Sequence, residues 1–282
     1  MIDETAAEIR EMRTHSSSVV AVKAAEALRE VTEREYAAVE EYLRALERNS
    51  SALRRANPSH ATLQTTQRDI VAAVEDSDPE TVAAAKERTT EAIEAAVEGV
   101  EAGKRGAAEN TAAELDDGAT LLTHDYSTTV LEAVERATER GADLTVYVTE
   151  ARPRFMGRRT ARALAALGVD TRLIVDSAAG HYLPDVDEVV VGMDCIVDGT
   201  LYNRVGTYPL AATAADAGVP VTAVGSSAKL VGEGFRFEND FRPTSEVIRE
   251  PPEGFAVENP AYDATPTRLL ERVITDEGVE YF

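Results

Sequence analysis

The chain has 282 residues, of which 44% are hydrophobic, so it is long enough to bury one large core or two modest ones. It carries 51 acidic and 29 basic residues, for a formal net charge of −22, and the acidic residues are dispersed along the chain. Such a surface repels a phosphate backbone, and no basic stripe or aromatic platform is present, so we expect no direct nucleic-acid binding.

The scarcity of lysine helps to interpret this net charge. Only four of the 29 basic residues are lysine, and the rest are arginine. An acidic surface with few lysines is typical of proteins that stay hydrated in molar salt, where a Debye length of ~3 Å screens self-repulsion. We therefore predict adaptation to a salt-rich cytoplasm. The alternative is an acidic surface that binds a basic partner.

The absence of a recognisable targeting signal and the single cysteine both favour a cytoplasmic location. No segment approaches the ~18 consecutive apolar residues of a membrane-spanning helix. The first residues are acidic and amphipathic, and they lack the basic and apolar regions of a signal peptide. Cys195 is the only cysteine, which excludes an internal disulfide. We expect a cytoplasmic protein that does not associate with a membrane.

Residues 1–108 have the pattern of a helical domain. Glycine is absent before Gly99, and apolar residues recur at helical spacing. Asp78 and Pro79 form a helix start signal, which places Pro79 at the first helical position of a long, alanine-rich helix over about 80–101. The pattern predicts a helical N-terminal domain of four or five helices.

Residues 109–282 alternate short β-rich runs with alanine-rich helical runs. The predicted strands cover 119–123, 144–150, 171–176, 188–194 and 220–225, and the predicted helices cover 128–140, 157–167 and 206–217. The strand runs are continuously rich in Val, Leu and Ile, which indicates a parallel sheet buried on both faces. The predicted fold class is therefore α/β, with a helical N-terminal domain followed by a Rossmann-like parallel-sheet domain.

Polar side chains follow the predicted strands, at the sheet edge where parallel sheets bind ligands. Arg152 and Arg158 follow the second strand, and Gly206 and Thr207 open a helix. An arginine fork and the free N–H groups of a helix start both suit a phosphate group. The alternative is that these arginines form surface ion pairs.

Other common sites are missing from this domain. The sequence contains no dinucleotide-binding fingerprint, P-loop, nucleophile elbow or metal-ligand cluster. Its two histidines, His124 and His181, have no metal-binding companion at helical spacing. We therefore expect no metal and no cofactor, and we expect a phosphorylated small molecule as the ligand.

Four motifs occur in order along the second domain. They are Glu150-Ala151-Arg152-Pro153, Gly192-Met193-Asp194, Asn203-Arg204-Val205-Gly206-Thr207 and Asn259-Pro260-Ala261-Tyr262-Asp263-Ala264-Thr265-Pro266. They resemble motifs of the family that includes the initiation factor 2B alpha, beta and delta subunits, methylthioribose-1-phosphate isomerase and archaeal ribose-1,5-bisphosphate isomerase. The resemblance covers about 120–282 and, with the acidic surface, suggests a halophilic archaeal member. It implies a helical domain and a Rossmann-like domain, usually dimerised through the latter.

The resemblance also bears on chemistry. The isomerases of the family open a ribose-1-phosphate ring and move hydrogen between C1 and C2, using a cysteine after the first strand and the aspartate of a G-x-D element. Asp194 matches that aspartate, whereas Asp125 stands where the cysteine would be. The isomerases also have an R-G-A element that contributes to phosphate binding. Here the comparable segment reads Arg13-Thr14-His15-Ser16-Ser17-Ser18, which is more similar to the initiation-factor branch.

Two functions remain open. We favour an initiation-factor-2B-like regulatory protein, not an enzyme, that binds a phosphorylated sugar or nucleotide, forms a homodimer or higher homo-oligomer and contacts translation factor subunits. The alternative is an aldose–ketose isomerase for ribose-1,5-bisphosphate or methylthioribose-1-phosphate, with Asp194 acting at C1 and C2 and Asp125 or Cys195 as its partner. The ligand-binding candidates are Arg152, Arg158, Asn203, Arg204, Gly206, Thr207 and Lys229.

Overall fold

The computed structural model describes residues 2–11, 16–232, 235–250 and 253–282. The chain divides into two compact units, Met1–Ala102 and Gly103–Phe282, and helix α6 (Val82–Glu114) belongs to both. The predicted boundary after residue 108 also falls within this helix. Of the segment compared with the R-G-A element, residues 13–15 lie outside the described residues.

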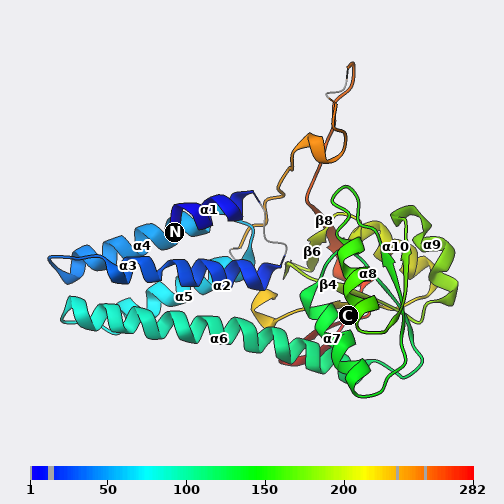
Figure 1. Ribbon diagram of the computed structural model, residues 1–282, viewed down its shortest axis with the longest axis horizontal. Helices are drawn as coiled ribbons and strands as arrows, with labels where there is room; N and C mark the ends of the chain where they lie inside the picture. The colour runs from blue at the N-terminus through cyan, green and yellow to red at the C-terminus, as the bar shows by residue number, and fades with distance from the viewer. Residues whose placement is uncertain (1, 12–15, 233–234, 251–252) are drawn as a thin grey trace. The chain divides into compact units, whose positions relative to one another are not determined.

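The first unit is helical (Figure 1). Its described residues form α1 (Ile2–Arg10), α2 (Ser17–Ala27), α3 (Arg29–Glu33), α4 (Val39–Ala56), α5 (Ala61–Glu75) and the first part of α6, which is more helices than predicted. Each long helix buries one face in a shared core. Tyr42 and Ile93 are fully buried there, and the Tyr42 hydroxyl donates to the Thr89 hydroxyl at 2.6 Å.

Helix α6 begins and ends later than predicted. It begins at Val82, where the Thr81 hydroxyl accepts a hydrogen bond from the Ala84 N–H at 3.1 Å, so Pro79 precedes the helix. It continues past Glu101, through Gly103 and Gly106, and ends at Glu114. Gly106 instead permits close packing, since a Cβ there would lie 2.8 Å from the Asp276 side chain.

The second unit is built on a seven-stranded sheet in the order β10-β9-β7-β4-β1-β2-β3. The strands are β1 (Thr120–Thr123), β2 (Thr145–Thr149), β3 (Asp170–Ile174), β4 (Glu188–Gly192), β7 (Val221–Val224), β9 (Arg272–Thr275) and β10 (Gly278–Tyr281). All neighbours are parallel except β9 and β10. Its α-helices are α7 (Thr128–Glu139), α8 (Gly157–Ala166), α9 (Ala179–Tyr182) and α10 (Thr207–Ala217). The predicted α/β class and the five predicted strands are confirmed.

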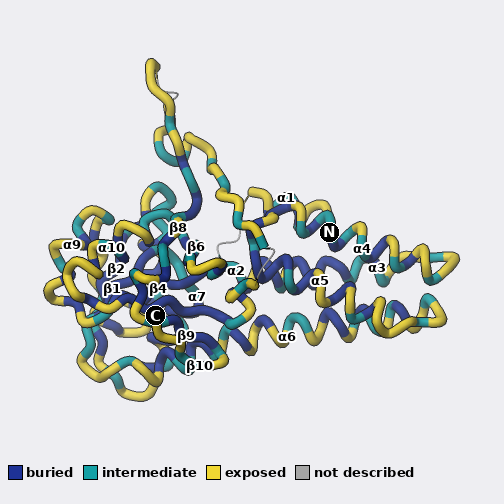
Figure 2. The backbone as a smooth tube through the Cα atoms, turned by 180° about the vertical axis from the view of Figure 1, so that it is seen from behind, coloured by how far each residue is buried: buried dark blue, intermediate teal, exposed yellow. Residues whose placement is uncertain are grey.

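Burial differs between the centre and the edge of this sheet (Figure 2). All four residues of β7 are buried, whereas β3 at the edge leaves Leu173 47% exposed and the following Val175 53% exposed. The prediction that every strand is buried on both faces is therefore wrong for β3, which has a neighbouring strand on one side only.

A smaller antiparallel sheet was not predicted. It contains β5 (Cys195–Val197), β6 (Thr200–Arg204) and β8 (Tyr262–Pro266), in that order. Asp198 and Gly199 turn the chain between β5 and β6 with φ of 49° and 70°, the backbone that an Asp-Gly hairpin turn needs. Before β8, the chain at 239–242 pairs with 259–262, and we call these two segments the arm (Figure 1).

The strand order predicts where a ligand would bind on this sheet. The chain runs outward from β1 to β3 and then returns to β4, on the other side of β1. In parallel sheets, ligands bind outside the carboxyl ends of the strands at such a switch point. The residues that follow β1 and β4 are therefore the first to consider. No helix within the described ranges is both long and apolar enough to cross a lipid bilayer.

Candidate active site at the strand switch point

Two aspartates follow the two strands of the switch point. Asp125 comes after β1 with a φ of 62°, in the left-handed region that aspartate tolerates better than most residues. Asp194 comes after β4, and its N–H donates to the Tyr202 carbonyl on β6 at 3.1 Å. The antiparallel sheet thus fixes the second aspartate. Both side chains are only 15% exposed.

Arg204, the last residue of β6, lies between these aspartates. Its Nε is 3.6 Å from Asp194 Oδ2 and 3.9 Å from Asp125 Oδ2, and its guanidinium lies over the Tyr262 ring at 4.7 Å. Burial alone would lower the pKa of Arg204, but Tyr262 and the two aspartates outweigh burial and raise it. The side chain is therefore a fixed cation between two carboxylates.

Lys229 also reaches this centre. It is 5% exposed, and its Nζ donates to the Met193 carbonyl, beside Asp194, at 2.8 Å. Burial lowers the pKa of Lys229, while the charge of Asp194 opposes that effect. Lys229 therefore lies beside Asp194, and its ammonium group is bonded to the protein backbone.

Cys195 does not have the environment of a reactive thiol. It is fully buried on β5, and burial, followed by the charge of Asp194, raises the pKa of its thiol to about 12. A thiolate nucleophile or readily ionised acid needs the opposite shift. Asp125 is therefore a better partner for Asp194 than Cys195 is, because Asp125 and Asp194 both lie beside Arg204.

The predicted phosphate cradle at the start of α10 is filled by the protein itself. Asp263 Oδ2 accepts hydrogen bonds from the N–H groups of Gly206 at 2.7 Å and Tyr208 at 3.0 Å. The Asn203 amide donates to the Thr207 hydroxyl at 3.0 Å, and that hydroxyl donates to the Arg204 carbonyl at 2.7 Å. Gly206 and Thr207 therefore shape this turn, and the anion held at the helix start is a carboxylate of the chain.

His124 explains why the turn needs glycine. Its Nε2 is 2.8 Å from the Val205 carbonyl, so Nε2 carries the proton, and its Nδ1 is 2.6 Å from the Thr149 hydroxyl. The ring packs against Gly206, whose φ is 108° and where a Cβ would lie 2.5 Å from the ring. His124 thus joins the ends of β1, β2 and β6 and supports Arg204.

The two arginines predicted after β2 lie in different surroundings. The Asp176 carboxylate accepts from the N–H groups of Ala151 and Arg152 at 2.7 and 2.8 Å, which fixes the loop. Arg152 lines a cleft beside Asp125. Arg158 is not among the residues lining that cleft. It pairs with Glu150 at 2.7 Å and stacks on Phe155, as the ion-pair alternative predicted.

The cleft beside Asp125 contains residues that the sequence did not single out. We call it the arginine cleft, because Arg152, Arg154, Arg204 and Arg242 line it together with Asp125, Ala151, Pro153, Val205, Asn259, Pro260 and Ala261. Arg154 adjoins the E-x-R-P motif, which was a usable signal. Arg242 belongs to the arm, whose sequence has no strand or helix pattern, so nothing indicated its place.

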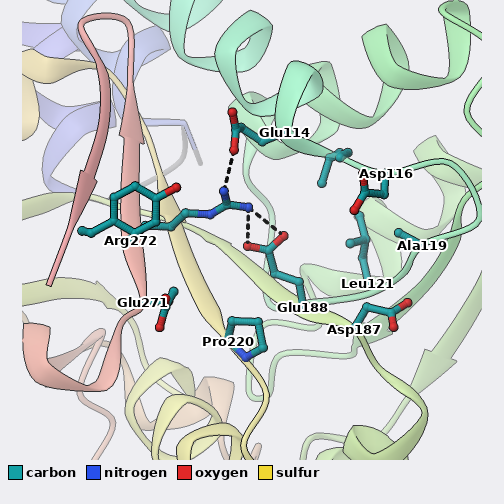
Figure 3. Close-up of a pocket in the computed structure, with 11 residues that line it drawn as sticks. Glu114, Asp116, Ala119, Leu121, Asp187, Glu188, Pro220, Glu271 and Arg272 are labelled. Atoms are coloured by element: carbon teal, nitrogen blue, oxygen red, sulfur yellow. Dashed lines mark hydrogen bonds and ion pairs between the residues drawn. The ribbon is translucent and has the colours of Figure 1, made fainter.

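A second cleft lies at the amino ends of the strands, opposite the carboxyl ends where the aspartates lie (Figure 3). Its wall includes Glu114, Asp116, Asp187, Glu188 and Glu271, with Arg272 as its one lining cation among the described residues. Arg272 pairs with Glu114 at 2.7 Å and Glu188 at 3.0 Å. This acid-rich wall repels phosphate, so charge favours the carboxyl edge as the ligand site.

Comparisons with known proteins fit this architecture. The model of the initiation factor 2 subunit family matches residues 13–281. A ribose 1,5-bisphosphate isomerase of Haloferax volcanii is 33% identical over 98% of this chain and 88% of its own. The ribose 1,5-bisphosphate isomerase of Haloterrigena turkmenica is 34% identical over 97% of this chain and 88% of its own.

Two solved structures of this family have a similar fold. The Pyrococcus horikoshii OT3 translation initiation factor eIF-2B superposes with a TM-score of 0.81 at 26% identity, covering 99% of this chain and 96% of that one. The 5-methylthioribose 1-phosphate isomerase of the same organism gives a TM-score of 0.81 at 26% identity, covering 99% and 84%.

These relatives correct one expectation. The preference for a non-catalytic regulatory protein is wrong, because the relatives that are 33 and 34% identical over nearly the whole chain are named as isomerases. That preference gave the missing cysteine too much weight and the paired aspartates too little. The comparisons favour the isomerase alternative. By the match over residues 13–281 and by these relatives, the chain belongs to the initiation factor 2 subunit family.

Proposed function

We propose that this protein is an aldose–ketose isomerase for a ribose-1-phosphate-type sugar phosphate, with ribose 1,5-bisphosphate as the first candidate. The observation that carries the proposal is Arg204 between Asp125 and Asp194, at 3.9 and 3.6 Å, at the switch point of a parallel sheet. The names of the two halophilic relatives support the choice of sugar.

The reaction needs one proton donor and one proton acceptor. Opening the ring breaks the bond between C1 and the ring oxygen, and that oxygen takes a proton. Hydrogen then moves from C2 to C1, so C1 is reduced and C2 is oxidised to a ketone as its hydroxyl loses a proton. One proton enters and one leaves, and no external oxidant is required.

The two aspartates can divide these roles. Asp125 serves as the general acid toward the ring oxygen, and Asp194 serves as the general base for the C2 hydroxyl. Paired carboxyl groups with different roles are a common way to combine an acid and a base at one centre. Arg204 orients both groups and offsets negative charge on the bound phosphate. A carboxylic acid thereby takes the place of the family's cysteine thiol.

The decisive experiment follows ribose 1,5-bisphosphate by NMR in high salt, with the wild-type protein and Asp194→Asn. We expect conversion to the ketose by the wild type and a loss of ~10²- to 10⁴-fold in kcat in the variant, the usual contribution of a positioned acid–base group. Ligand-induced thermal stabilisation should remain in the variant, because the amide keeps the shape of the side chain. Binding without conversion by the wild type would refute the proposal.

A further inference from the structure

Helix α8 carries a concentration of positive charge in an otherwise acidic chain. Residues 151–169 contain five arginines and no aspartate or glutamate, although the whole chain has 51 acidic and 29 basic residues. Three of these arginines, Arg158, Arg159 and Arg162, lie on α8 and are exposed, and we call them the α8 ridge. None of the three lines the arginine cleft, so the proposed reaction does not account for them.

The spacing of the α8 ridge places its side chains on one face of the helix. Arg158 and Arg162 are four residues apart, and Arg159 and Arg162 are three apart, so each pair are neighbours on the helix surface. The opposite face of α8 is buried through Thr160 and Leu164. Like charges four residues apart destabilise a helix, so folding alone gives no reason for this arrangement.

The chain neutralises only one member of the α8 ridge. Arg158 pairs with Glu150 at 2.7 Å. Within the described part of the chain, neither Arg159 nor Arg162 forms an ion pair with a carboxylate. By contrast, Arg136 on the neighbouring helix α7 pairs with two glutamates. Two exposed guanidinium groups on α8 therefore keep an uncompensated positive charge.

Aromatic rings hold two of these guanidinium groups in place. Arg159 lies over the Tyr126 ring, 4.5 Å from its centroid, and Arg158 lies over the Phe155 ring at 3.9 Å. Stacking uses the flat face of a guanidinium and leaves the N–H groups at its edge to donate hydrogen bonds. A side chain ordered in this way loses less conformational entropy when it binds a carboxylate.

We infer that the α8 ridge binds an acidic segment of another protein. Carboxylates fit the ridge because the arginine fork binds them through two parallel hydrogen bonds. The ridge spans four residues of helix, or ~6 Å, so a short segment with closely spaced Asp or Glu side chains can contact all of it. A nucleic acid fits less well, because a long polyanion would also meet the acidic surface that gives the chain its net charge of −22.

Fluorescence anisotropy tests this inference with a labelled peptide of alternating glutamate and alanine, titrated with the protein across a KCl series. The ridge variant is Arg159→Gln with Arg162→Gln. The matched control, Arg44→Gln with Arg48→Gln, removes the same charge from exposed positions on α4. We expect micromolar binding by the wild type, ~10-fold weaker binding by the ridge variant, and a Kd within about twofold of the wild type for the control. Binding should weaken as KCl increases.

Four results would overturn the inference. The first is no binding by the wild type, or equal affinity for a peptide with glutamine in place of glutamate. The second is equal weakening by the two double variants, because binding would then follow net charge and not the ridge. The third is tighter binding of a single-stranded oligothymidylate of the same length, and the fourth is a lower sedimentation mass of the ridge variant, which would assign the ridge to contact between copies. Thermal midpoints establish that each variant is folded, and no outcome depends on whether the protein isomerises a sugar phosphate.

Discussion

At the scale of single residues, the replacement of a thiol by a carboxyl group is the central question. Asp125 and Asp194 are bridged by one guanidinium, and in the proposed reaction they supply an acid–base pair without cysteine. The backbone at Asp125 has a φ of 62°, so the side chain leaves the strand end at an angle fixed by the turn. A hydrogen bond from the Thr160 hydroxyl to the Asp125 carbonyl at 2.6 Å secures that turn.

Asp125 can be tested by two substitutions of similar size. Asp125→Asn removes the acidic proton, and we expect kcat for ribose 1,5-bisphosphate to fall ~10²- to 10⁴-fold. Asp125→Cys supplies a different ionisable proton, and we expect it to retain more activity than Asp125→Asn. Wild-type turnover in Asp125→Asn, measured by the same NMR assay, would exclude Asp125 as the proton donor.

The buried thiol of Cys195 gives a prediction about stability and pH. Its pKa is raised to about 12 in the folded protein, above the ~8.5 of an unfolded cysteine. Between these values the unfolded state has lost the proton and the folded state keeps it, so stability falls as pH rises. Compared with Cys195→Ala, the wild type should lose up to ~1.4 kcal/mol more per pH unit above pH ~9. Urea unfolding at several pH values measures the difference; parallel curves would contradict the assignment.

At the scale of elements, close packing between β2 and α8 positions the cleft. Gly157 begins α8, and a Cβ there would overlap the Thr149 carbonyl oxygen. The helix can therefore approach the strand end only if this residue is glycine. The loop between them carries Arg152 and Arg154, so the approach also positions two residues that line the arginine cleft.

Two glycine-to-alanine substitutions should have opposite effects on stability. Gly157→Ala should lower the free energy of unfolding by more than ~1 kcal/mol and weaken sugar-phosphate binding, because the helix must shift. Gly99→Ala, in α6 with open space around the new Cβ, should raise it by ~0.5–1 kcal/mol through helix propensity. Denaturant unfolding of both variants provides the test. Equal effects of the same sign would refute the packing argument.

The elements that were predictable share one property. The five central strands and helices α7, α8 and α10 follow from local hydrophobic pattern, which one stretch of sequence contains. The strands β5, β6 and β8 are short and antiparallel, and their pairing joins residues far apart in the chain. Asp125, Asp194 and Arg204 were predictable from strand ends and motifs. Asp263 belongs to the fourth motif, but its contact with the start of α10 was not predicted, and Arg242 lines the cleft through a segment with no local pattern.

At the scale of the whole molecule, the net charge of −22 should make stability depend on salt. Self-repulsion of the folded state decreases as the Debye length falls from ~10 Å at 0.1 M to ~3 Å at 1 M. We expect the thermal midpoint to rise as KCl increases, with most of the gain below ~1 M. Differential scanning calorimetry across a KCl series measures this. A flat series would contradict adaptation to a salt-rich cytoplasm.

Self-association is the second whole-molecule prediction. At the edge strand β3, Leu173 and Val175, the residue after the strand, are about half exposed, which is unusual for apolar side chains on the edge of a sheet. Sedimentation in high salt should therefore give a mass of at least twice the 30.3 kDa of one chain. A mass equal to one chain at micromolar concentration would refute the predicted homodimer or higher homo-oligomer.

The carboxylate at the start of α10 has a consequence at high salt concentration. A helix start open to solvent attracts small anions, and molar chloride would populate it. Asp263 is tethered to the chain through β8, so it competes for the Gly206 and Tyr208 N–H groups at a high effective concentration. The turn that supports Arg204 is thereby insulated from the anion composition of the surroundings, and chloride inhibition should arise only where the substrate phosphates bind.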